Sequence, residues 1–86
     1  MINASILLAR RVAPWFECAK QIEGVKTGAE LGARMGLSAP QVSRASRGAG
    51  PAEHVLALCD RGAINPAERA EVVYLLTGVW PIGGGS

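Results

Sequence analysis

Five glycines divide this sequence into short segments, and their spacing constrains the fold more than any other feature. They lie 12, 12, 14 and 16 residues apart, each directly after a stretch with helical apolar periodicity: Gly24, Gly36, Gly48, Gly62 and Gly78. A glycine at such a place can adopt the left-handed conformation that satisfies the last carbonyl groups of a helix. The glycines therefore predict the ends of five helices.

The beginnings of these segments carry side chains that can cap a helix. Residues 27–30 and 38–41 have the spacing of a capping box, in which the first and fourth side chains accept hydrogen bonds from unpaired backbone N–H groups. Asn65 followed by Pro66 is a close variant, and Pro51 can open a helix in the same way. The predicted helices are therefore residues 4–23, 28–35, 39–47, 52–61 and 66–77.

The composition agrees with an all-α fold. Hydrophobic residues make up 49% of the chain, but only 5% of residues are aromatic, and alanine and leucine are prominent among the others. The 86 residues suffice for one domain, which we place at residues 1–82, with a disordered tail at residues 83–86. Pro14 interrupts the first predicted helix, which is either kinked there or split into two short helices.

Several classes of protein are not expected from this sequence. No apolar run is long enough to cross a membrane, and the N-terminus is apolar first and basic second, the reverse of a secretory signal. Cys18 and Cys59 lack metal-binding spacing and are interpreted as reduced core residues. His54, the only histidine, is interpreted as a surface or capping residue. We therefore expect a cytoplasmic non-enzyme with no catalytic residue, no metal and no cofactor.

Positive charge is concentrated in the middle of the chain. The net charge is only +2, but residues 24–50 contribute +3, against +1 for residues 1–23 and −2 for residues 51–86. The central segment has one acid, Glu30, and four basic residues: Lys26, Arg34, Arg44 and Arg47. An excess of positive charge in one segment indicates a surface that can meet nucleic acid.

The second and third predicted helices have the features of a helix-turn-helix. Gly36 supplies the tight corner between them, and Gly32 lies where they approach closest, so that a side chain larger than alanine would separate them. The apolar contacts that hold the two helices at a fixed angle are assigned to Leu31, Met35, Leu37 and Val42.

Residues 30–44 resemble the helix-turn-helix of the lambda-repressor and Cro superfamily. The resemblance continues through residues 51–58 and 62–66 and covers about residues 27–78. It implies a lambda-repressor-like five-helix domain in the cytoplasm of a bacterial host. Two features depart from the family: Gly32 stands where alanine is usual, and the long first helix contains Pro14.

The resemblance also implies which residues meet DNA. The third helix would lie in the major groove, with Val42 and Ala45 facing inward. Arg44 is the strongest candidate for reading a base, because its guanidinium can bind O6 and N7 of guanine together. The residues assigned to base reading are Ala39, Pro40, Gln41, Ser43 and Arg44, and Arg47 would also face the groove. The residues assigned to phosphates are Lys26, Thr27, Arg34, Ser38, Ser46 and Arg47.

For three of these assignments the alternative is a role that does not involve DNA. Gln41 either closes the capping box or turns toward an adenine or a phosphate. Ser38 is a helix cap first and a phosphate ligand second. Arg34, Arg44 and Arg47 could be solvated charges on an exposed helical face.

The last predicted helix has more apolar surface than one core can cover. Residues 72–76 are five consecutive apolar residues, which point to every side of a helix, and residues 6–9 raise the same problem. We therefore predict a homodimer whose interface contains Val72, Val73, Leu76, Val79, Trp80 and Ile82. The alternative is a fully enclosed last helix, with the Trp80 tail folded back onto its own subunit.

These features together predict a sequence-specific transcriptional regulator. The predicted protein is a phage or prophage repressor of the Cro type that binds a palindromic operator in double-stranded DNA as a homodimer. No ligand-sensing domain is recognisable, so no small-molecule effector is expected. The alternative is a protein-interaction module, such as an antitoxin or an adaptor, that uses the same helical fold.

Overall fold

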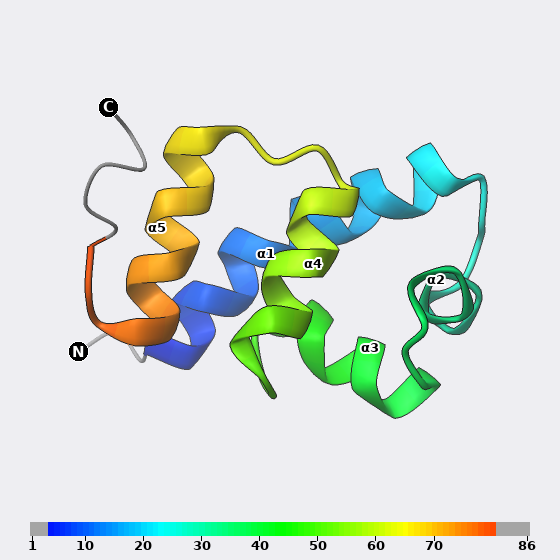
Figure 1. Ribbon diagram of the computed structural model, residues 1–86, viewed down its shortest axis with the longest axis horizontal. Coiled ribbons are helices and arrows are strands. Elements are labelled where there is room, and N and C mark those ends of the chain that lie inside the picture. Colours follow the sequence, from blue (N-terminus) through cyan, green and yellow to red (C-terminus); the bar gives the residue numbers. More distant parts are fainter. Residues whose placement is uncertain (1–3, 81–86) are drawn as a thin grey trace.

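The structure, a computed structural model, describes residues 4–80, and within them the chain forms five helices and no strand (Figure 1). The helices are α1 (Ala4–Glu23), α2 (Gly28–Met35), α3 (Ala39–Ser46), α4 (Ala52–Arg61) and α5 (Pro66–Thr77). Four of the five predicted ranges are confirmed at both ends. The third helix ends one residue early, because Arg47 has left helical geometry, with φ −99° and ψ 7°.

Pro14 lies inside α1, which is one continuous helix and is not split in two. Pro14 is on the exposed side of the helix. The predicted disordered tail at residues 83–86 lies outside the described residues. No helix in residues 4–80 is long and apolar enough to cross a membrane.

Four of the five predicted glycine stops have the left-handed conformation. Gly24, Gly36, Gly48 and Gly78 have φ between 70° and 76°. Gly62 does not, because its φ is −82° and the left-handed position falls on Ala63 (φ 60°). The prediction for Gly62 was therefore wrong about its role. Gly62 is buried, and a Cβ there would collide with the backbone carbonyl of Trp15.

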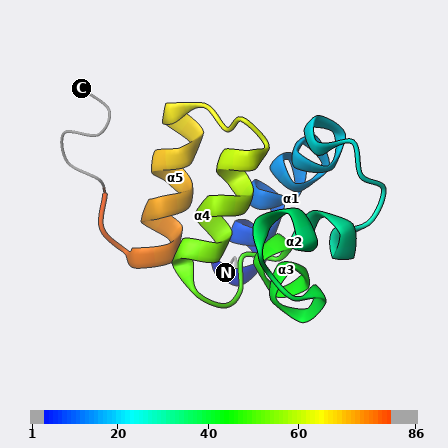
Figure 2. The same cartoon turned by 45° about the vertical axis from the view of Figure 1, so that its right-hand side comes forward.

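The core lies where α1 crosses the other helices. Its fully or almost fully buried side chains come from all five helices: Leu8, Val12, Ala19, Leu31, Val42, Ala45, Val55, Leu58, Cys59 and Val72. No buried residue in residues 4–80 is polar or charged. Figure 2 shows α4 in the middle, with α2 and α3 on one side of it and α5 on the other. The helix pair α2–α3 therefore lies at the opposite end of the molecule from α5.

The position of α5 corrects the predicted dimer interface. Val72 is 1% exposed and points into the core, so it cannot contribute to an interface. Leu76 packs partly against the core, and Val73 is half-buried. Val79 and Trp80 are exposed, and Ile82 lies outside the described residues. The helix is not enclosed, because it packs against α1 and α4 alone.

Candidate nucleic-acid interface

The corner between α2 and α3 is closed by backbone hydrogen bonds to a single carbonyl. Gly36, with φ 74° and ψ 24°, donates its N–H to the Gly32 carbonyl oxygen. Leu37 donates to the same oxygen at 2.8 Å, which is the 6→1 bond of a Schellman motif, while the bond from Gly36 is the 5→1 bond of an αL motif. Only three residues separate the two helices, and Figure 1 shows α2 almost end-on while α3 runs across the view. The corner thus sets α3 at a steep angle to the helix before it.

Gly32 fits this corner more tightly than the sequence indicates. A Cβ at Gly32 would lie 2.8 Å from the Leu37 carbonyl oxygen and 3.2 Å from Val42 Cγ1. Alanine itself is therefore crowded here, although the sequence predicted room for alanine and for nothing larger. Glycine lets α2 pack directly on the start of α3.

One face of α3 is buried and the other is open to solvent. Val42 and Ala45 are buried, as predicted, and hold α3 against the core. The opposite face consists of exposed side chains one helical turn apart: Ala39, Pro40, Ser43 and Arg44. At the end of the helix Arg47 is also exposed, and its Nη1 donates to Ser43 Oγ at 3.1 Å. The residues assigned to base reading therefore share one surface, with Gln41 at its edge.

The capping box at the start of α3 uses the side chain of Gln41. Ser38 N–H donates to Gln41 Oε1 at 2.8 Å, and Gln41 N–H donates to Ser38 Oγ at 3.3 Å. The amide oxygen of Gln41 is thus engaged within the protein. The sequence left open whether Gln41 closes the capping box or turns toward an adenine or a phosphate, and in the structure it closes the capping box.

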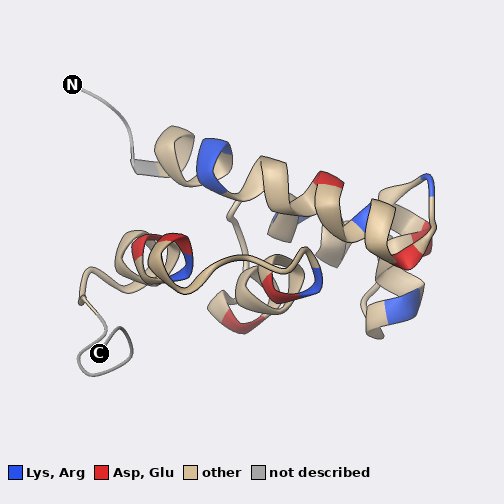
Figure 3. Ribbon diagram, turned by 90° about the horizontal axis from the view of Figure 1, so that it is seen from above, with Lys and Arg blue, Asp and Glu red and all other residues tan. Residues whose placement is uncertain are grey.

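Five exposed basic side chains form no ion pair within residues 4–80. One is Arg10 on α1, and the other four lie on α2, on α3 or in the segments next to them: Lys26, Arg34, Arg44 and Arg47. Four other basic side chains pair with acids at 2.9–3.2 Å: Arg11 with Glu71, Lys20 with Glu17, Arg61 with Glu23, and Arg69 with Asp60. In Figure 3 basic positions mark α2 and the loop before it, with an acidic position beside them, and acidic positions also accompany the basic ones on α4 and α5. The basic side chains without an ion pair are therefore concentrated around α2 and α3, with Arg10 on α1 as the exception.

Two of the hydroxyl groups assigned to phosphates are already used as donors. Thr27 Oγ1 donates to the Glu30 carboxylate at 3.2 Å and accepts from Glu30 N–H at 3.1 Å. This is half of the predicted capping box, because Glu30 bonds the hydroxyl and not the backbone N–H of Thr27. Ser46 Oγ donates to the Ser43 carbonyl oxygen at 2.8 Å. The hydroxyl protons of Thr27 and Ser46 are thus directed away from a phosphate.

The N-terminus of α3 also offers few donors to an anion. Pro40 has no backbone N–H, and the N–H of Gln41 is capped by Ser38. Helix N-termini bind phosphate through free N–H groups, and here the first turn keeps only that of Ala39. The basic side chains are therefore the main groups of this surface that could hold an anion.

Most of the exposed large apolar side chains in residues 4–80 lie at the other end of the molecule, with Ile22 near the end of α1 as the exception. The rings of Tyr74 and Trp80 lie 5.7 Å apart with an interplanar angle of 53°. Tyr74 was missed in the predicted interface, although it lies two residues after Val72 and hence on the opposite side of α5. Ile6 is also exposed, on the N-terminal end of α1.

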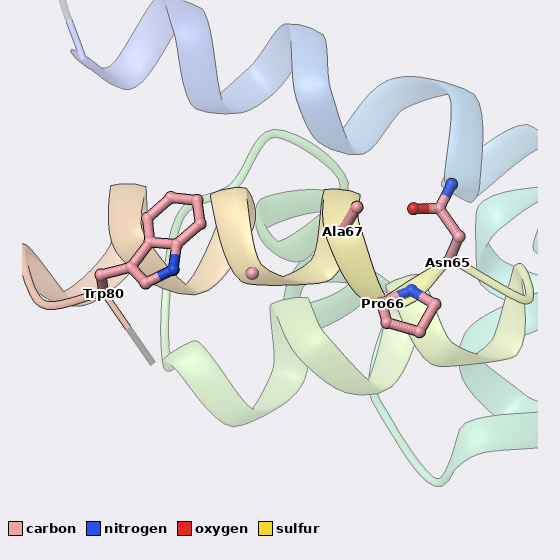
Figure 4. Close-up of a pocket in the computed structure, with 5 residues that line it drawn as sticks. Asn65, Pro66, Ala67 and Trp80 are labelled. Atoms are coloured by element: carbon pink, nitrogen blue, oxygen red, sulfur yellow. The ribbon is translucent and has the colours of Figure 1, made fainter. Parts of the chain in front are cut away.

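A shallow hollow of about 580 Å³ lies along α5 beneath Trp80, lined by Asn65, Pro66, Ala67, Ala70 and Trp80. Figure 4 shows the indole lying back over the helix. Trp80 thus lies against α5 of its own subunit and is still 53% exposed. The lining has no charged or nucleophilic group, and Asn65 Oδ1 caps α5 by accepting from Glu68 N–H.

The remaining reactive side chains are separate from these surfaces. Cys59 is buried in the core and Cys18 is half-buried, and both are free thiols. Burial, with a smaller contribution from Asp60, raises the pKa of the Cys59 thiol to about 11. His54 is half-buried, and no group of His, Cys, Asp or Glu in residues 4–80 could hold a metal ion.

Comparisons of the chain with protein-family profiles, with curated protein sequences and with solved structures found no match.

Proposed function

We propose that this protein is a sequence-specific DNA-binding regulator whose α3 lies in the major groove of its operator. The observation that carries the proposal is the outward face of α3, which follows a glycine corner and carries Arg44 and Arg47. Neither arginine has an acidic partner in residues 4–80, and neither does Arg34 on the preceding α2. A helix about 10–12 Å across matches the width of the major groove, about 12 Å. The lambda-repressor and Cro superfamily is the proposed family.

In this proposal the basic side chains supply the part of the affinity for DNA that does not depend on the base sequence. Each phosphate neutralised by Lys or Arg releases counterions, which makes binding weaken as salt rises. Lys26, Arg34 and Arg47 are the proposed phosphate ligands, and the hydroxyl of Ser38 can add one further donor. Thr27 and Ser46 hold the ends of their helices and are not part of this proposal.

The proposed regulator acts as a homodimer on a palindromic site. One helix in one groove buries too little surface for tight operator binding, and such proteins place two recognition helices about 34–36 Å apart. The exposed Tyr74–Trp80 pair and Val79, at the far end from α3, are the proposed contact between two copies. Such a dimer would leave both α3 faces free.

The proposal includes no catalysis and no effector. Repression would follow from occupancy of the operator in the cytoplasm of a bacterial host, and the concentration of the protein would set the degree of occupancy.

Selection from a randomised duplex library tests the proposal. The enriched duplex should bind at least about 10³-fold more tightly than a scrambled duplex at ~150 mM salt. A library from which no sequence is enriched would contradict the proposed function.

A matched pair of arginine variants tests the proposed surface. Arg34→Ala should weaken binding to every duplex and lower the slope of log affinity against log salt by about 1. Arg10→Ala removes another exposed arginine that forms no ion pair within residues 4–80, but from α1, and should leave the slope unchanged. Equal slopes for the two variants would place the phosphate contacts elsewhere.

The exposed apolar side chains also support a second candidate, a protein-interaction module such as an antitoxin or adaptor. Ile6, Tyr74, Val79 and Trp80 are all about half exposed or more in residues 4–80. Arg44→Ala discriminates between the two functions. A DNA reader should lose about 1–3 kcal/mol of specific binding, whereas a protein adaptor should keep its affinity for its partner.

A further inference from the structure

On the exposed face of α3, fewer polar side chains are free to bind base edges than the sequence of the helix suggests. The amide oxygen of Gln41 accepts from Ser38 N–H at 2.8 Å, so a bidentate contact to adenine would require the capping box to open. Arg47 is drawn back along the helix toward Ser43 Oγ at 3.1 Å. Ser43 can bond to several bases and discriminates weakly between them.

Arg44 is the long side chain of this face whose donors are all unused. Arg44 is exposed, and within residues 4–80 its guanidinium takes part in no hydrogen bond or ion pair. Its planar guanidinium matches the two acceptors O6 and N7 that guanine presents in the major groove. No other base pair presents two acceptors on one base edge in this way.

The first turn of the same face is apolar. Ala39 and Pro40 are exposed and have no side-chain donor or acceptor, and Pro40 has no backbone N–H. The matching apolar group in the major groove is the C5-methyl of thymine. A polar base edge opposite these residues would lose its hydrogen bonds to water without replacement.

We infer that each operator half-site is read by two determinants, a guanine bound by Arg44 and a thymine methyl packed against Ala39 and Pro40. The inference rests on the proposed DNA-binding function. Four or five residues at ~1.5 Å of rise separate the two groups by about 6–7.5 Å along α3. Base pairs rise about 3.4 Å per step, so the thymine and the guanine lie about two base pairs apart.

The test uses the enriched duplex with single-base replacements. Replacing the guanine by 7-deazaguanine removes N7, and it should weaken the wild-type protein about tenfold and the Arg44→Ala variant not at all. Arg44→Ala should itself lose about tenfold to a hundredfold on the unmodified duplex. Replacing the thymine by uracil removes only the methyl group and should cost the wild type about fourfold. Pro40→Ala should reduce that loss.

Each outcome bears on the inference separately from the proposed function. If the protein selects a sequence but Arg44→Ala responds to 7-deazaguanine as strongly as the wild type, the guanine is read by another residue and the inference is wrong. It is also wrong if no thymine in the half-site is sensitive to uracil. If no sequence is selected at all, the proposed function fails and the inference fails with it.

Discussion

The backbone of Gly62 packs directly against the backbone carbonyl of Trp15, and this contact joins the end of α4 to the middle of α1. Gly62 has φ −82°, a conformation open to any residue, so glycine is needed here for space and not for its backbone freedom. The neighbouring Ala63 carries the left-handed turn instead, and Ile64 N–H closes it on the Cys59 carbonyl oxygen at 3.2 Å.

Gly62→Ala should therefore destabilise the protein by about 3 kcal/mol, at the upper end of the range for overpacking, because a backbone group cannot move aside as a side chain can. Gly24→Ala is the matched control: it meets no atom within 4 Å, and its cost of about 1 kcal/mol comes only from the left-handed backbone (φ 70°). Urea unfolding of both variants measures the difference. Equal losses would mean that Gly62 does not need the space.

Gly32→Ala should also destabilise the protein, by about 1–2 kcal/mol, although helix propensity alone favours alanine by about 1 kcal/mol. The added Cβ would lie 2.8 Å from the Leu37 carbonyl oxygen, which forms part of the corner. Thermal unfolding checks the sign. A variant more stable than the wild type would show that the corner has room for alanine.

Because the thiol of Cys59 is buried, we predict that the protein loses stability at high pH. Its pKa rises from 9.0 to about 11 in the folded protein, so above pH 9 the unfolded chain loses this proton more readily than the folded chain. The contribution is complete below pH 9 and is lost as pH rises through 11, by roughly 2–3 kcal/mol in total. Unfolding of the wild type and Cys59→Ala at pH 8 and pH 11 should show this extra loss only in the wild type. Equal losses in both proteins would rule out Cys59 as the cause.

Alanine substitutions at Val72 and Trp80 should affect two different quantities, the free energy of unfolding and the strength of the dimer. Val72→Ala removes buried methyl groups and should cost about 1–3 kcal/mol with no specific effect on dimerisation. Trp80→Ala removes an exposed ring and should leave the monomer folded while it weakens the dimer. Sedimentation at micromolar concentration measures the assembly. A wild-type protein that sediments as an 8.9 kDa species would contradict the dimer.

The helix boundaries could be predicted because they depend on local chemistry. A glycine after the last turn and a capping side chain before the first act within a few residues, and the ranges of α2, α4 and α5 follow from them. The burial of Val42 and Ala45 was implied by the resemblance of residues 30–44 to a known helix-turn-helix, and the structure confirms it.

The residues whose roles were predicted wrongly depend on contacts with residues distant in sequence or on competing hydrogen bonds. Gly62 meets Trp15 across 47 positions of the chain, which no local pattern records. Val72 points inward because α5 packs on α1 and α4, whereas an apolar run alone does not indicate which side is covered. Thr27 and Ser46 carry hydroxyl groups that could reach a phosphate, but nearer acceptors hold their protons.

Amide NMR during a DNA titration tests the central claim, that the face of α3 meets DNA, most directly. A random-sequence duplex at ~50 mM salt suffices, because non-specific binding uses the same basic side chains. The account predicts that the largest shift changes fall on residues 26–50, with the Arg44 side-chain N–H among them, and that α5 is unaffected. Changes centred on α5, or none at all at millimolar duplex, would contradict it.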